Sequence, residues 1–189
     1  MIMINIARSV VLALIGLAPF ATISIFFIIT LIASPNADSG LSLYIGDNLV
    51  NSEDLADAGD DVQDVIFDIF RFLRELNIAL LSLTLIISLG WSVGSHYLNV
   101  DAPGKAKIYS IHWLIFTGIF IALVFGILFW FTQTTAYQAE QYLSGRGKTI
   151  IIFASLIFYI SMYYAGVLLG TARFARSSVL LANKLPGGF

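Results

Sequence analysis

Residues 61–100 limit the possible folds more than any other part of the chain, because a charged helical segment leads directly into a long uncharged one. In residues 61–75, apolar side chains recur at the i, i+3, i+4 and i+7 spacing of one helix face, while Asp, Glu and Arg lie on the other face. Residues 76–100 contain no Lys, Arg, Asp, Glu or Pro. A helix over the whole stretch would extend about 60 Å, roughly twice the hydrocarbon thickness of a bilayer. The stretch therefore predicts a helix that begins outside a membrane, or flat on its surface, and then crosses it.

Three other segments are also long and uncharged enough to cross a bilayer, namely residues 9–33, 108–131 and 149–171. Of the 189 residues, 58% are hydrophobic and 12% are charged, whereas about 25% of a typical soluble domain is charged. The chain has no cysteine, which excludes disulfides, thiolate metal sites and a cysteine nucleophile. We therefore expect an all-α, polytopic membrane protein: a bundle of four transmembrane helices, with an amphipathic helix leading into the second.

The charged residues between these spans predict the topology. Almost all acidic residues lie between Asp38 and Glu75, and the loop before the second span has no Lys or Arg. Because cytoplasmic loops are enriched in Lys and Arg, we expect both termini in the cytoplasm of a multi-pass protein of the bacterial inner or plasma membrane. The basic residues that flank the spans on this side are Arg8, Lys105, Lys107, Arg173, Arg176 and Lys184.

The first hydrophobic run is longer than the about 7–15 residues of a cleaved signal peptide, so we expect it to remain as an anchor. The organisation then follows from the alternation of spans and polar segments. It comprises a signal-anchor span (1–33), an acidic extracytoplasmic loop (34–60), the amphipathic helix that continues into the second span (61–100), a cytoplasmic turn (101–107), the third span (108–131), a second extracytoplasmic loop (132–148), the fourth span (149–171) and a basic cytoplasmic tail (172–189).

Small residues four positions apart occur on three of the predicted spans. Such spacing lets helix backbones approach closely and gain van der Waals contact. We expect these faces to pack against partner subunits, although packing within the chain would use the same spacing. The residues are Gly90 and Gly94 on the second span, Gly118, Ala122 and Gly126 on the third, and Gly166 and Gly170 on the fourth.

The apolar face of the helix before the second span is expected to dock on another subunit. A free helix would expose these side chains to water, and a position in the lipid headgroup layer is the alternative. Interfacial helices that bind anionic bilayers are rich in Lys and Arg, whereas this segment is mainly acidic, which favours a protein partner. The docking residues would be Val62, Ile66, Ile69, Phe70 and Leu73.

Apart from two histidines, the predicted spans contain no acidic or basic side chain, which disfavours proton relays, ion-coupled transport and voltage sensing. No catalytic or metal-binding motif of fixed spacing is apparent, so we expect neither an enzyme nor a bound cofactor or metal. His96 and His112 leave one alternative open. On neighbouring helices at similar depth they would ligate a haem axially; otherwise they are interfacial histidines that face lipid headgroups.

These features favour a non-catalytic integral-membrane subunit of a larger multi-protein complex, such as a secretion, conjugation or energy-converting assembly. Its partners would be other membrane-protein subunits and the lipid bilayer, not nucleic acid, and a homo-oligomer is the other form of assembly. One alternative is a self-assembled channel or small-solute transporter. Another is a small haem- or quinone-binding redox subunit that uses His96 and His112. The channel would be lined by Ser82, Thr84, Ser88, Ser92 and Ser95.

Overall fold

The computed structural model describes the backbone of residues 2–33, 48–50, 62–97, 105–133 and 142–171. It describes the side chains of residues 3–33, 48–50, 64–97, 111–132 and 142–171. The predicted acidic loop, cytoplasmic turn and basic tail lie largely or entirely outside these ranges, as do residues 134–141 of the predicted second loop.

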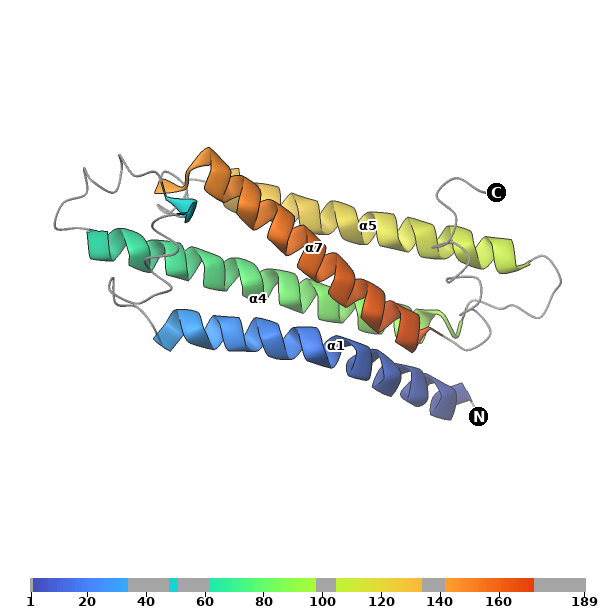
Figure 1. Ribbon diagram of the computed structural model, residues 1–189. Helices are drawn as coiled ribbons and strands as arrows, with labels where there is room; N and C mark the ends of the chain where they lie inside the picture. The colour runs from blue at the N-terminus through green and yellow to red at the C-terminus, as the bar shows by residue number, and fades with distance from the viewer. Residues whose placement is uncertain (1, 34–47, 51–61, 98–104, 134–141, 172–189) are drawn as a thin grey trace. The chain divides into compact units, whose positions relative to one another are not determined.

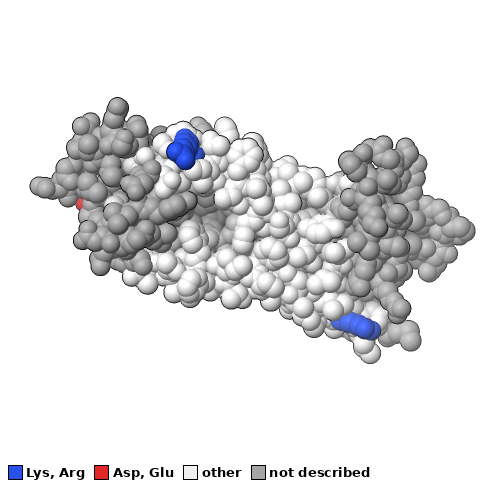
Figure 2. Space-filling model, viewed as in Figure 1, with Lys and Arg blue, Asp and Glu red and all other residues white. Residues whose placement is uncertain are grey.

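Four long α-helices make up nearly all of the described residues (Figure 1). They are α1 (Ile2–Ala33), α4 (Val62–Gly94), α5 (Lys105–Gln133) and α7 (Gly145–Gly170). Each contains a segment long and apolar enough to cross a membrane: Met3–Ala33, Asp64–Gly94, Ile111–Thr132 and Gly145–Gly170. Most of the described surface drawn in Figure 2 carries neither basic nor acidic side chains. The predicted all-α class and its four membrane-length helices are thus confirmed.

The second of these helices, α4, ends at Gly94, before the predicted boundary at residue 100. The N–H of His96 donates to the carbonyl of Val93 at 3.1 Å, and the N–H of Tyr97 donates to the carbonyl of Gly94 at 3.0 Å. Both bonds run from residue i to residue i−3, the pattern of a tighter turn. The α-helical hydrogen bonding therefore stops where the backbone tightens after Gly94.

The chain divides into two compact units, each of which contains part of all four helices. The first unit comprises residues 1–21, 82–123 and 159–189, and the second comprises residues 22–81 and 124–158. Apolar side chains form the interior of both units. Examples are Leu17, Phe120 and Met162 in the first and Ile69, Leu80 and Leu128 in the second.

In the first unit, α7 approaches α1 and α4 through glycine. Gly166 and Gly170 are both buried. A Cβ atom on Gly166 would lie 2.7 Å from Leu17 Cδ2, too close for any side chain to fit without movement. A Cβ atom on Gly170 would lie 2.6 Å from Ala13 Cβ and would also collide with the Ser92 hydroxyl of α4. This pair of glycines therefore serves packing within the chain.

A glycine of α1 contributes to the same contact. A Cβ atom on Gly16 would lie 2.6 Å from the carbonyl oxygen of Ala165 and 3.1 Å from Leu169 Cδ1. Helices that carry glycine on both sides of a crossing bring their backbones closer than larger side chains allow. The contact between α1 and α7 thus involves the α7 backbone as well as its side chains.

Aromatic rings join α5 to α7 in the first unit. Phe120 of α5 stacks on Tyr163 of α7, with ring centroids 4.2 Å apart and an interplanar angle of 15°. The hydroxyl of Tyr163 lies 3.1 Å from the hydroxyl of Thr117, so a hydrogen bond satisfies the polar end of the ring. The α5–α7 contact therefore combines apolar stacking with one polar link.

In the second unit, α4 makes polar and aromatic contacts with its neighbours. The buried Ser24 hydroxyl of α1 donates to Asn77 Oδ1 at 2.6 Å. Phe72 of α4 and Phe131 of α5 have ring centroids 6.1 Å apart, at an interplanar angle of 57°. Interhelical hydrogen bonds of this kind stabilise helix pairs where water is excluded.

The start of α7 packs on residues 48–50 in the second unit. The Ser144 hydroxyl accepts a hydrogen bond from the N–H of Gly147 at 2.9 Å, as a helix N-cap does, and donates to the carbonyl of Leu49 at 3.1 Å. Val50 forms an antiparallel bridge with Leu143. A Cβ atom on Gly147 would collide with the backbone of Leu49, so the close approach requires glycine.

Replacing Gly170 with alanine should lower stability by roughly 1–3 kcal/mol, because the added methyl group overlaps with Ala13 and Ser92. The matched control is Gly118→Ala on α5, where an added Cβ atom meets nothing within 4 Å. We expect the control to be at least as stable as wild type, since alanine favours a helix more than glycine does. Thermal unfolding in mild detergent measures both; equal melting temperatures for the two variants would contradict the close α7 contact.

Candidate functional site

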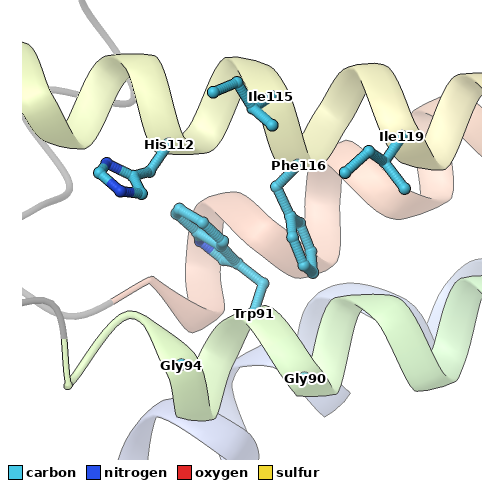
Figure 3. A pocket seen from close by; sticks show the side chains of 7 residues that line it. All are labelled: Gly90, Trp91, Gly94, His112, Ile115, Phe116 and Ile119. Atoms are coloured by element: carbon cyan, nitrogen blue, oxygen red, sulfur yellow. The ribbon is translucent and has the colours of Figure 1, made fainter.

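An open groove of about 270 Å³ lies between α4 and α5 in the first unit (Figure 3). The indole N–H of Trp91, a lining residue, donates to the Thr171 hydroxyl at 2.9 Å, so this polar atom already has a partner within the chain. The remaining lining groups are apolar except for the imidazole of His112. The residues that define this α4–α5 groove are Gly90, Trp91 and Gly94 of α4 and His112, Ile115, Phe116 and Ile119 of α5.

The groove is open because its α4 side lacks side chains at two positions. A Cβ atom on Gly90 or on Gly94 would meet nothing within 4 Å. The rings of Trp91 and Phe116 lie together between the two helices, with centroids 5.2 Å apart at an interplanar angle of 41° (Figure 3). At the rim, Ile115 remains 57% exposed. The groove can therefore take an apolar group without displacing any side chain of α4.

A second feature is the α5 small-residue face, formed by Gly118, Ala122 and Gly126, all of which are exposed. Neither Gly118 nor Gly126 has an atom within 4 Å of an added Cβ position. Gly166 and Gly170, by contrast, are buried against α1 and α4. The small residues singled out in the sequence therefore divide into an inward pair on α7 and outward sets on α4 and α5.

The apolar face at the start of α4 is covered by the chain itself. Ile66, Ile69, Phe70 and Leu73 are all buried in the second unit. The side chain of Val62 lies outside the described residues. Since these four side chains are shielded within the fold, they need no partner to leave water; their docking on another subunit stays a prediction.

The two histidines have different surroundings in the first unit. The imidazole Nε2 of His96, in the turn after α4, lies 2.8 Å from the Ser9 hydroxyl of α1. His112 is exposed and lines the α4–α5 groove. The pKa of His96 is lowered by burial, which disfavours the imidazolium form. The described contacts thus direct His96 to α1 and His112 to the groove, instead of placing both at one ligand.

Four of the five hydroxyl residues of the proposed channel lining are fully buried: Thr84, Ser88, Ser92 and Ser95. Ser92 donates to the carbonyl of Ser88 at 2.9 Å, and Ser95 donates to the carbonyl of Ser92 at 3.3 Å. Such bonds satisfy the hydroxyls of Ser92 and Ser95 within their own helix, whereas the buried Ser88 hydroxyl has no hydrogen-bond partner among the described residues. These side chains therefore act as small interior residues, and only Ser82 is exposed.

Sequence reasoning singled out His112 only as a candidate haem ligand, and it missed the groove residues Ile115, Phe116 and Ile119 and the close-contact glycines Gly16 and Gly147. The spacing of His112, Phe116 and Ile119, at i, i+4 and i+7, marks one helix face and was available as a signal. For the glycines no pattern was available, because their contacts lie on other helices or on residues 48–50.

Within the described residues, no group of three or more His, Cys, Asp or Glu side chains is placed to hold a metal ion. Comparison of the chain with protein-family models, with curated proteins and with solved structures found no match. A function is therefore inferred from the groove and from the α5 small-residue face.

Stability should fall in mild acid because of His96. Its pKa is below the ordinary 6.5 in the folded state, so its contribution to stability is complete above about pH 6.5 and is lost as the pH falls through the lowered value. His96→Gln should reduce this decline, whereas His112→Gln, the matched control, should retain it. Melting temperatures measured between about pH 7.5 and pH 5 test this; identical pH profiles for the two variants would contradict the burial of His96.

Proposed function

We propose that this chain is a non-catalytic integral-membrane subunit of a larger multi-protein complex and that it packs on its partner through the α5 small-residue face. The observation that carries the proposal is the lack of any internal use for Gly118 and Gly126. Glycine within a helix costs roughly 0.5–1 kcal/mol relative to alanine. Among the residues that the structure describes, no close contact offsets that cost at either position. A partner helix that packs on this face would make the close contact that offsets the cost of these glycines.

The membrane spans support the same role. The helices contain no Lys, Arg, Asp or Glu between Ser9 and Ala33, between Leu76 and Gly94, between Ile111 and Thr132, and between Thr149 and Gly170. Groups that transport ions or protons through a membrane usually include such residues. A structural role in an assembly requires only complementary helix surfaces.

The proposed orientation places both termini in the cytoplasm and residues 34–60 and 132–148 outside, following the distribution of Lys and Arg. The contacts of residues 48–50 support one part of this arrangement. Val50 pairs with Leu143, and the N–H of Ser144 donates to the carbonyl of Leu49 at 2.9 Å. Two loops that meet in this way belong on the same side of the membrane.

The channel and redox alternatives have weaker support. The hydroxyls of Thr84, Ser88 and Ser92 are buried inside one chain, so they are not available to line a pore between copies. His96 lies 2.8 Å from the Ser9 hydroxyl of α1, whereas His112 lines the α4–α5 groove. The assembly role therefore remains the best interpretation.

The test is the assembly state of Gly118→Leu and Gly126→Leu in mild detergent. Overpacking a helix contact costs roughly 1–3 kcal/mol, so each variant should weaken assembly by roughly five- to a hundredfold. The stability of the isolated chain should not fall, because nothing lies within 4 Å of either position. Native mass spectrometry reports the mass relative to the 20.7 kDa chain and identifies the co-purifying subunits.

Ala154→Leu is the matched control, since it adds similar bulk at an exposed position of α7. It should assemble like wild type. A wild-type protein that purifies only as a monomer, or glycine variants that assemble as wild type does, would contradict the proposal and leave the α5 small-residue face in contact with lipid.

A further inference from the structure

We propose that the α4–α5 groove binds one anionic phospholipid, with an acyl chain along the groove and the phosphate beside His112. The inference requires that the four helices lie in a membrane, but it does not depend on assembly with other subunits. It follows from the shape of the groove, the position of its one polar end and the charge around that end.

The interior of the groove suits an acyl chain. Gly90 and Gly94 leave a strip of α4 without side chains, and Ile115 and Ile119 form an apolar edge on α5. The Trp91 indole N–H is already bonded to Thr171, so it presents only the ring to the groove. An apolar chain would therefore leave no polar group of these residues without a partner.

The polar end of the groove is at the level expected for a lipid headgroup. His112 lies five residues after Lys107, the last charged residue before the uncharged run of α5. From His112 the groove continues along α5 to Ile119, a rise of about 10 Å. That length remains within one leaflet of a hydrocarbon core about 30 Å thick. The groove thus runs from the headgroup region into the acyl region, as an amphiphile does.

The charge at this end favours an anionic headgroup over a zwitterionic one. The sequence from Lys105 to Ile111 carries two positive charges, Lys105 and Lys107, and no negative charge. In the proposed orientation this end faces the cytoplasmic leaflet, where anionic lipids are concentrated.

The experiment is native mass spectrometry of the intact protein after delipidation in detergent. Phosphatidylglycerol and phosphatidylcholine with identical acyl chains are added in parallel titrations. We expect one phosphatidylglycerol to bind with clear preference over phosphatidylcholine. Gly90→Leu and Gly94→Leu, which fill the groove, should each abolish this binding, while their melting temperatures stay near that of wild type because both positions are open.

The headgroup end is tested separately by His112→Gln, and the basic charge before it by Lys105→Gln. Each should weaken phosphatidylglycerol binding and leave phosphatidylcholine binding unchanged. For Lys105→Gln, which removes one positive charge, we expect a decrease of about fivefold. Gly118→Leu is the control for bulk on the neighbouring face, because Gly118 is exposed but does not line the groove. It should bind phosphatidylglycerol as wild type does.

Equal binding of the two lipids, or phosphatidylglycerol binding that survives both Gly90→Leu and Gly94→Leu, would overturn the proposal. If Gly90→Leu and Gly94→Leu no longer co-purify with another protein but bind lipid as wild type does, the groove binds a partner helix, and the lipid proposal is overturned. A quinone that displaces phosphatidylglycerol and binds more tightly would overturn it in favour of a cofactor site. Each result is separate from the effect of Gly118→Leu on assembly, so the two proposals can fail independently.

Discussion

The close approach of α7 to α1 and α4 is the contact on which the rest of the first unit depends. In a bilayer, helices gain little hydrophobic free energy by touching one another, because lipid chains are as apolar as leucine. Association then rests on van der Waals contact between closely spaced backbones. Gly16, Gly166 and Gly170 make that spacing possible, since a Cβ atom at any of them would overlap with a neighbouring helix.

Because packing within the chain uses the glycines of α7 and α1, the other small residues are left on the surface. Gly90 and Gly94 form one side of an apolar groove, and Gly118 lies on the exposed face of α5. One fold therefore presents two outward features of different chemistry. The groove has a histidine at one end and an apolar interior, whereas the α5 small-residue face carries the small side chains that let a second helix approach closely.

The sequence was sufficient to predict four membrane-length helices, because uncharged runs of more than twenty residues have few other structures. It was not sufficient to predict which helix faces point inward. The four-residue spacing is the same for Gly166 and Gly170, which are buried, and for Gly118 and Ala122, which are exposed. That choice depends on the rotation of each helix about its axis, which is set by contacts between residues far apart in the chain.

The same limit applies to the start of α4. The segment is helical in the structure, but the burial of its apolar side chains within the chain could not be derived from the spacing of Ile66 and Phe70. The partners of those side chains come from other helices, as the contact of Phe72 with Phe131 illustrates. Local periodicity therefore identifies a surface that will be buried, and only the tertiary fold identifies what covers it.

The most direct test of this account is disulfide formation between α1 and α7. The chain has no cysteine of its own, so Leu17→Cys with Gly166→Cys introduces a single pair at the close contact. The account predicts rapid oxidation to an intramolecular disulfide in the membrane, detected as a monomer of altered mobility and by mass spectrometry after proteolysis. The comparison pair is Leu17→Cys with Gly118→Cys. If this pair forms an intramolecular disulfide readily and the Leu17–Gly166 pair does not, then α5 and not α7 packs against α1. That result would contradict the account.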